Sequence, residues 1–396
     1  MTPPRPPYVA PDRQGLSSVD QQPLAAPKMS VSVFPGDQNY QDNIIFDRSW
    51  ILNSGWCEAM VALREQARAQ GIELGTADRV PMEQSDIILF VNLPTHRAAV
   101  EQIRQRYPRA LLVLIASESP VVQPHAAVRS NHQLFDRVFT LKRLKGDPMK
   151  YHRLPAGCAF VPNPAPADIP FTQRRFAILV NSNVNSGLLR ASRPLNVFDQ
   201  GRTIRNGGWS LPLQRQLQVS LGSRYHLRRR FARAAEGLDI ADFDLYGQGW
   251  EPLRSGWFHR FFPESPWRQW RGPLNDDKLH SLSHYRFAFC YENFAGSEGS
   301  ISEKVFDALA AGTVPLCHGD RHLRRWIPAS CAVFRDDYSS DRELLRDLLR
   351  WDEARWRACR DAGQAFLRSD GAAPFLANAY AEDVLRGLRG AVEATP

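Results

Sequence analysis

The chain has 396 residues, more than one compact core usually holds, so two domains are expected. Its content of 43% hydrophobic and 23% charged residues is that of an ordinary globular protein. The net charge of +8 favours an anionic partner such as a nucleotide, nucleic acid or a membrane surface, and a basic surface without a specific partner is the alternative.

Two further classes of feature are missing from the sequence. The longest apolar runs, such as residues 110–116, are far shorter than the roughly 20 residues of a membrane span, and no segment resembles a signal peptide.

The six cysteines form no CxxC pair and no zinc-type cluster with histidine. Cys290 and Cys317 lie in apolar runs, where a buried free thiol is expected. A reducing compartment follows, with one or two disulfides left open, and we expect a cytoplasmic, soluble or peripheral protein.

The N-terminal half alternates strands and helices. Residues 1–28 are rich in proline, glutamine and serine, which predicts a disordered leader. Gly71 follows a helical pattern and is expected to cap it. The pattern predicts strands at 31–36, 86–94, 110–120 and 134–143, and helices at 54–70 and 98–107. This alternation predicts a parallel sheet.

A cluster of prolines at 162–170 predicts a linker to a second α/β unit. The second unit is predicted to have strands at 174–183, 285–291 and 313–318, helices at 225–237, 276–284 and 301–311, and a helical tail from 341 onward. The run DFDLYGQGW (242–250) follows the first of these helices. Segments 184–222 and 251–275 are interpreted as loops. The domains are therefore predicted as a leader at 1–28, an N-terminal α/β domain at 29–165, a C-terminal α/β domain at 170–375 and a helical tail at 376–396.

Two α/β units joined by a linker suggest a cleft between domains. Ligands of open parallel sheets bind at the carboxyl ends of the strands. The polar residues that follow the predicted strands are therefore the candidates for a site. They are Ser117-Glu118-Ser119, Asn181-Ser182-Asn183 and Glu292-Asn293.

The run 287–320 combines several signals of a phosphate site. Gly296 and Gly299 precede a helix whose start, Ser300 to Glu303, fits a capping box. The free N–H groups at a helix start favour an anion, and Lys304 adds a positive charge in the first turn. A bound anion would relieve the unfavourable position of that lysine. The alternative is structural: Glu303 caps the helix as its N3 residue, and Lys304 is a solvated side chain.

The same run carries a family resemblance. YENFAGSEGSISEKVFDALAAGTVPLCHGD (291–320) resembles the signature of family 10 glycosyltransferases, the α-1,3/4-fucosyltransferases. RFAILVNSN (175–183), RYHLRRRF (224–231) and DLYGQGW (244–250) resemble family segments in the same order, and ESP (118–120) with FDRVFTLKR (135–143) resembles the acceptor domain. Ser302 replaces the usual threonine, Ser300 stands where many bacterial members have an aromatic residue, and 184–222 has no recognised counterpart.

The resemblance implies a GT-B-like α/β fold, with two Rossmann-like domains facing a central cleft, and inverting transfer of fucose from GDP-fucose to an acceptor oligosaccharide or glycoconjugate. It implies Glu118 as the base and Lys304 with Arg228 as the cations at the diphosphate, with Arg229 as the alternative to Arg228. Glu303, Asn293 and Ser300 are expected at the donor. Asp276-Asp277 is interpreted as a charge pair at a helix start rather than a metal motif, so we expect no obligatory metal or cofactor.

Three other functions stay open. The protein could use another nucleotide sugar on the same fold. The Arg- and Trp-rich stretch 250–271 could bind single-stranded nucleic acid, although no recognised motif supports this, and we expect no nucleic-acid partner. It could also be an inactive sugar-binding relative, against which Glu118, Glu303 and Lys304 argue. The basic C-terminal half would allow peripheral contact with an acidic membrane, and the missing N-terminal anchor separates the chain from Golgi-type members.

Overall fold

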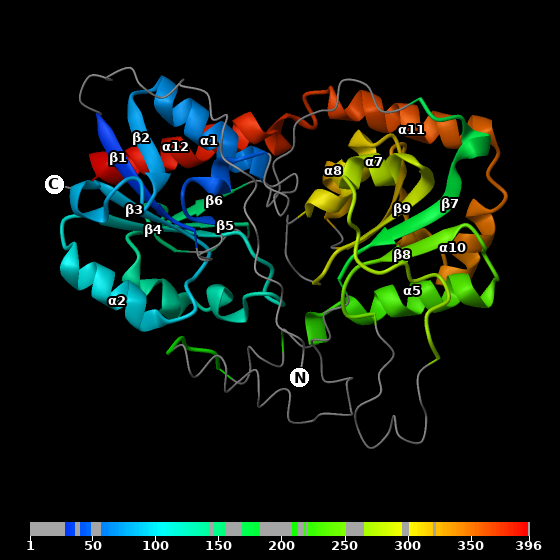
Figure 1. The fold of residues 1–396 in the computed structure, drawn as a ribbon, viewed down its shortest axis with the longest axis horizontal. Coiled ribbons are helices and arrows are strands. Elements are labelled where there is room, and N and C mark those ends of the chain that lie inside the picture. Colours follow the sequence, from blue (N-terminus) through cyan, green and yellow to red (C-terminus); the bar gives the residue numbers. More distant parts are fainter. Residues whose placement is uncertain are drawn as a thin grey trace, which may run out of the picture.

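The computed structural model describes residues 28–35, 40–48, 57–141, 144, 146–154, 168–182, 208–212, 218, 221–250, 265–294, 301–319 and 322–394. Residues 1–27 of the predicted leader (1–28), most of the proline-rich linker and much of segments 184–222 and 251–275 lie outside these residues. The described residues form two lobes that lie side by side, each built on its own sheet (Figure 1).

The N-terminal lobe contains a six-stranded sheet in the order β2-β1-β3-β4-β5-β6, with every neighbouring pair parallel. Its strands are β1 (Met29–Phe34), β2 (Ile72–Thr76), β3 (Ile87–Val91), β4 (Leu111–Ala116), β5 (Arg137–Thr140) and β6 (Tyr151–Arg153). Its helices include α1 (Cys57–Ala69) and α2 (Arg97–Arg106). Gly71 closes α1 at φ 72°, in the left-handed region that favours glycine, as predicted.

The centre of the sheet is buried on both faces, which explains why β3 (IILFV) and β4 (LLVLIA) are purely apolar. Neighbouring residues of β3 alternate between the two cores: Ile87 and Leu89 pack on the side of α1, whereas Ile88 and Phe90 pack on the side of α2. This period of two is the geometry of a strand.

The C-terminal lobe contains a five-stranded parallel sheet in the order β11-β10-β9-β7-β8. Its strands are β7 (Arg175–Val180), β8 (Phe243–Tyr246), β9 (Tyr285–Tyr291), β10 (Val314–His318) and β11 (Val333–Phe334). Its helices are α5 (Tyr225–Gly237), α7 (Lys278–Ser283), α8 (Glu303–Ala310), α9 (Leu323–Trp326), α10 (Asp341–Leu348) and α11 (Glu353–Leu367). The predicted bounds of α5 and β9 agree with the structure, and the predicted fold class, with two Rossmann-like α/β domains, is confirmed.

The last helix, α12 (Ala377–Glu393), leaves the C-terminal lobe and packs against α1 of the N-terminal lobe (Figure 1). Val384, Leu385 and Leu388 are fully buried in the same core as β1 and β3. Arg137 of β5 donates to the carbonyl oxygen of Gly387 at 2.7 Å. The segment that we expected to be a helical tail therefore completes the core of the first domain.

A second segment from the middle of the chain also packs on the N-terminal lobe. Trp209 is 4% exposed in the core beside α2, and its indole N–H donates to the carbonyl oxygen of Pro94 at 2.8 Å. Ser210 and the side chain of Asn131 exchange two hydrogen bonds, of 2.9 and 2.8 Å. Residues 208–212, expected to belong to a loop of the second domain, are thus attached to the first.

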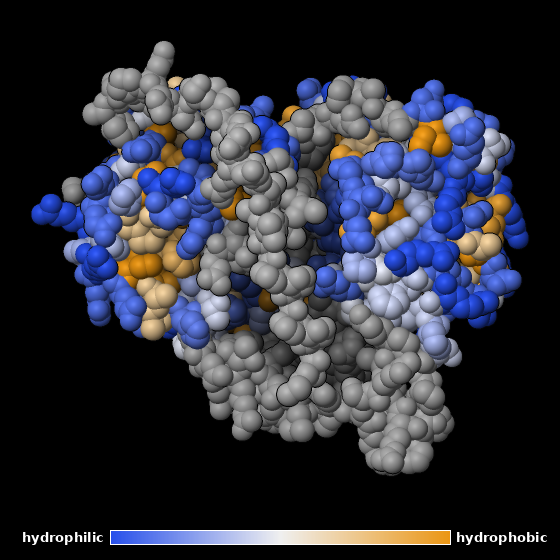
Figure 2. Space-filling model, viewed as in Figure 1, coloured by the Kyte–Doolittle hydropathy of each residue, from blue (hydrophilic) through white to orange (hydrophobic). Residues whose placement is uncertain are grey.

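The surface seen in Figure 2 is hydrophilic over most of both lobes, with limited apolar areas. No helix among the described residues combines the length and apolarity that crossing a membrane requires. All five cysteines in the described part of the chain are free and buried. This agrees with the prediction for Cys290 and Cys317.

Candidate active site

The predicted polar residues follow strands at the carboxyl edges of both sheets. In the C-terminal lobe, Asn181 and Ser182 follow β7, and Glu292 and Asn293 follow β9. Gly247, after β8, passes so close that an added Cβ would lie 2.2 Å from the carbonyl oxygen of Asn181, at φ 131°. Only glycine fits there, because a side chain would collide with the backbone. The ends of β7 and β8 therefore meet tightly at one edge of the sheet.

Arg228 connects the ends of β7 and β9. It is 2% exposed on α5 and donates to the carbonyl oxygen of Ser182 at 2.5 Å and to Oδ1 of Asn293. Its guanidinium lies 4.3 Å from the ring centre of Tyr225. Its buried Nε and the buried Nδ2 of Asn181 have no hydrogen-bond partner among the described residues. Buried donors without a partner are costly, and an anionic ligand would satisfy them.

Arg229, the alternative to Arg228, has a different environment. Its guanidinium lies 5.2 Å from the ring centre of Trp267. Burial lowers the pKa of Arg228, and the negative charges of Glu292 and Glu303 counteract this effect. The geometry thus places Arg228, rather than Arg229, among the candidate donor-site residues.

Glu303 and Lys304 begin α8, and a third charged residue, Lys278, joins them. The Nζ of Lys304 lies 3.5 Å and that of Lys278 4.0 Å from Oε1 of Glu303. Desolvation opposes ionisation of Glu303, but Lys304 and Lys278 outweigh it and lower its pKa to about 2. Glu303 is therefore an ionised hydrogen-bond acceptor at any ordinary pH. Sequence reasoning missed Lys278, because nothing local marks a lysine one strand away as a partner of α8.

The predicted capping box is wrong. The helix begins at Glu303 with Ser302 as N-cap, so Glu303 is its first residue and not its third. The hydroxyl of Ser302 does not cap the helix, because it donates to Glu292 at 2.9 Å. Ser300, like Gly296 and Gly299, lies outside the described residues. The structural reading of Glu303 as a capping residue therefore fails, and Lys304, with a side chain 10% exposed, is not a solvated lysine.

Glu118 follows β4 in the other lobe. Its side chain reaches solvent, yet the surrounding protein desolvates its carboxyl group and raises its pKa. The charge of Glu303 raises this pKa further, and that of Lys304 lowers it. These couplings show that the end of β4 lies near the start of α8. The structure thus brings together Glu118, Glu303 and Lys304 from two domains.

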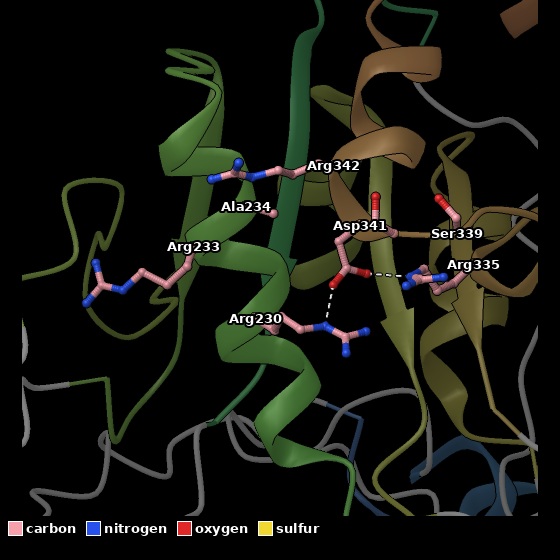
Figure 3. A pocket seen from close by; sticks show the side chains of 8 residues that line it. Arg230, Arg233, Ala234, Arg335, Ser339, Asp341 and Arg342 are labelled. Carbon is pink, nitrogen blue, oxygen red and sulfur yellow. Dashed lines mark hydrogen bonds and ion pairs between the residues drawn. The ribbon is translucent and has the colours of Figure 1, made fainter.

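A second cluster of arginines lies elsewhere on the C-terminal lobe. An open groove of about 380 Å³ between α5 and α10 is lined by Arg230, Arg233, Arg335 and Arg342. Figure 3 shows Arg230 and Arg335 turned toward buried Asp341, with Nε–Oδ distances of 2.7 and 2.6 Å. Asp341 neutralises much of this charge, so the groove holds α5 against α10 and is not part of the candidate site.

Within the described ranges, no three His, Cys, Asp or Glu side chains are grouped so that they could hold a metal ion. Asp277 is the N-cap of α7 and accepts from the amide of His280 at 2.7 Å, which agrees with its interpretation as a helix-start residue.

Comparison with known proteins identifies the C-terminal lobe. Residues 243–357 match the family described as "Glycosyltransferase family 10 (fucosyltransferase) C-term". Alpha-(1,3)-fucosyltransferase 7 of Mus musculus is 38% identical over 82 residues, which are 20% of this chain and 21% of that protein. Alpha-(1,4)-fucosyltransferase of Arabidopsis thaliana is 35% identical over 69 residues, 17% of each chain. The chain spans only 10% to 26% of the length of such curated relatives.

The whole chain is similar in fold to a solved structure. The crystal structure of an alpha1,3-fucosyltransferase with GDP-fucose superposes with a TM-score of 0.51 at 16% identity, covering 96% of this chain and 95% of that one. At this identity the likeness shows the fold alone. Together with the two parallel sheets, it establishes the GT-B-like architecture predicted from the sequence.

Proposed function

The chain belongs to glycosyltransferase family 10, whose C-terminal domain it carries at residues 243–357, and from this premise we propose that it is an inverting fucosyltransferase. Its donor is GDP-fucose, and its acceptor is a hydroxyl group of an oligosaccharide or glycoconjugate, in an α-1,3/4-type linkage. The observation that carries the proposal is the approach of Glu118 in one domain to Glu303 and Lys304 in the other.

The transfer needs a base, cations at the leaving group and groups that orient the donor. Glu118 takes the proton of the acceptor hydroxyl while that oxygen forms a bond to the anomeric carbon. The bond from this carbon to the diphosphate breaks, and GDP leaves with the electron pair. The raised pKa of Glu118 makes it a stronger base than an ordinary glutamate.

Lys304 and Arg228 neutralise the diphosphate, and no metal or other cofactor is obligatory in this proposal. The partnerless Nε of Arg228 supports this role. Ionised Glu303 accepts hydrogen bonds from fucose hydroxyls, and Asn293 holds Arg228 in place through its Oδ1. The proposal includes a cytoplasmic location, and the net charge of +8 supports peripheral contact with an acidic membrane.

A donor panel tests the proposal. GDP-fucose and GDP should raise the Tm and GDP-fucose should be turned over, whereas UDP-sugars should do neither. No response to any GDP-sugar would refute the proposal, and turnover of GDP-mannose in place of GDP-fucose would assign another donor.

Co-sedimentation with anionic vesicles tests the contact with an acidic membrane. If the protein does not sediment with these vesicles, the proposal of membrane contact is refuted.

Two pairs of variants separate the roles. Glu118→Gln should abolish transfer while the thermal shift by GDP stays, because the base does not contact the nucleotide. Loss of that shift would make Glu118 a donor-binding or structural residue. Arg228→Lys should weaken the thermal shift by GDP, and the matched Arg229→Lys should not. The reverse order would exchange their roles.

A further inference from the structure

The loop that carries Glu118 is held by a residue of the neighbouring strand end. Asn92 directly follows β3, whose last residue, Val91, pairs with Ile115 of β4. The backbone N–H of Asn92 donates to the carbonyl oxygen of Ile115 at 2.9 Å. Its side-chain Oδ1 accepts from the amide of Ser117 at 3.2 Å, from the hydroxyl of Ser117 at 3.1 Å and from the amide of Glu118 at 3.2 Å. A single amide oxygen thus fixes the first two residues of this loop.

The other end of the loop is fixed separately. Gln123 accepts from the amide of Leu93 and donates to its carbonyl oxygen, both at 3.2 Å. The loop from Ser117 to Gln123 is therefore tied at both ends to the two residues that follow β3. Asn92 holds the end at which the carboxylate of Glu118 is placed.

The backbone of Asn92 shows why asparagine suits this position. Its φ of 67° is in the left-handed region, which glycine adopts most easily and asparagine tolerates best among other residues. Glycine would reach the same backbone shape but would remove the oxygen that accepts the three hydrogen bonds. The residue therefore combines a turn conformation with an acceptor aimed at the amide of Glu118.

We propose that Asn92 is a positioning residue for Glu118, which it aims at the acceptor hydroxyl by holding the backbone of Ser117 and Glu118. This inference rests on the proposed function, in which Glu118 is the base. A displacement of about 1 Å at a reacting group can cost about 100-fold in rate. The side chain of Asn92 bonds to Ser117 and Glu118, so we expect its effect in kcat and not in donor binding.

Asn43 provides a matched control in the same domain. It also has a positive φ, 58°, and its Oδ1 accepts from the amide of Thr76 at 2.9 Å and from the Thr76 hydroxyl at 3.3 Å. Thr76 ends β2, the edge strand, and two strands separate it from β4. Asn43→Gly removes the same kind of contact from the same kind of backbone, far from Glu118.

Asn92→Gly in the full chain should lower kcat by about 100-fold. It should leave the KM for GDP-fucose and the thermal shift by GDP unchanged. The control, Asn43→Gly, should keep kcat within about twofold of the unmodified chain. Asn92→Asp keeps the acceptor oxygen, so its kcat should be much closer to that of the unmodified chain than the kcat of Asn92→Gly is. Glu303 and Lys304 are the charged groups that already act on the pKa of Glu118. The new negative charge of the carboxylate in Asn92→Asp should raise this pKa further, so the acidic limb of the pH–rate profile should move to higher pH.

The outcomes distinguish this inference from the proposed function. If no GDP-sugar binds or is turned over by the unmodified chain, the proposed function fails. If the unmodified chain transfers fucose and Glu118→Gln still does, the assignment of Glu118 as the base fails, and the role of Asn92 fails with it. If Glu118→Gln abolishes transfer while Asn92→Gly stays within about twofold of the unmodified chain, only the role of Asn92 fails. Should Asn92→Gly not fold, Asn92→Asp still decides: an unmoved acidic limb would overturn the proposal.

Discussion

Ser302 donates both its backbone amide and its hydroxyl to the same oxygen, Oε1 of Glu292, each at 2.9 Å. The amide of Glu292 in turn donates to the carbonyl oxygen of His318 at 2.8 Å. Glu292 therefore joins the ends of β9 and β10 to the start of α8, where Glu303 and Lys304 lie.

Loss of the Glu292 carboxylate should weaken both the fold and donor binding. Glu292→Ala leaves two half-buried donors of Ser302 without their acceptor, so we expect a loss of about 1–3 kcal/mol in the free energy of unfolding and a higher KM for GDP-fucose. Urea denaturation and initial rates measure these effects. Glu292→Gln keeps one acceptor oxygen and should cost less. Equal losses in the two variants would show that the contact to Ser302 is not what matters.

The buried ion pair beneath the site should behave as a unit. The Nζ of Lys278 lies 2.6 Å from Oδ2 of Asp307, whose side chain is almost fully buried. Burial acts to lower the pKa of Lys278, but Asp307 and Glu303 overcome this and raise it. Lys278→Met should therefore cost about 3–5 kcal/mol in urea denaturation, because it leaves a buried charge unpaired.

The double variant Lys278→Met/Asp307→Leu is the control for this pair. It removes both charges and should recover much of the lost stability. If the double variant is as unstable as the sum of the single ones, the pair is not the cause of the loss.

The pH dependence should separate the two glutamates. Burial and Glu303 raise the pKa of Glu118, and a protonated Glu118 cannot accept a proton. We therefore expect kcat to fall on acidification at a pH above the usual glutamate range of about 4.3. Glu303, with a pKa of about 2, stays ionised there, so its donor contacts are kept. A kcat that stays constant down to about pH 4.5 would contradict the role of Glu118.

The contact of Trp209 with the N-terminal lobe should be worth several kcal/mol. Trp209→Ala removes a buried indole and its hydrogen bond to Pro94, so the free energy of unfolding should fall by about 3–5 kcal/mol. Trp209→Phe keeps most of the apolar contact and should lose less. Leu221, which is exposed, is the control, and Leu221→Ala should change stability by under about 0.5 kcal/mol.

Two glycines of α12 should respond in opposite ways to alanine. An added Cβ at Gly387 would lie 2.5 Å from the Phe139 ring, so Gly387→Ala should destabilise the N-terminal lobe by about 1–3 kcal/mol. At Gly390 the nearest atom is the flexible end of Arg137, 3.4 Å away. Gly390→Ala should be neutral or stabilise by up to about 1 kcal/mol. Thermal unfolding of the two variants compares them directly.

Local signals account for most of the elements that the sequence predicted. Apolar runs predicted the strands β3, β4 and β9. A helical pattern that ends at a glycine predicted α1. Asp277 before α7 is an equally local signal. These features depend on a few neighbouring residues, so one sequence is enough to find them.

The features that the sequence did not predict depend on distant contacts. The capping box of Ser300 and Glu303 was predicted from local spacing, but the helix starts later, with Ser302 as its N-cap. The hydroxyl of Ser302 bonds to Glu292, ten residues away, which local spacing does not reveal. The amphipathic pattern of α12 does not say which domain its apolar face covers. Asn92 was predicted inside the strand 86–94, whereas the strand ends at Val91. Its role becomes visible only when the end of β4 is placed beside it.

The return of α12 to the first lobe has a consequence for synthesis. Domains of a growing chain usually fold in order from the N-terminus as they leave the ribosome. Here Val384, Leu385 and Leu388 belong to the core around β1 and β3, and they emerge after every strand of both sheets. The domain that is made first is therefore the last to complete its core, and until then its α1 side exposes an apolar surface for chaperones to protect.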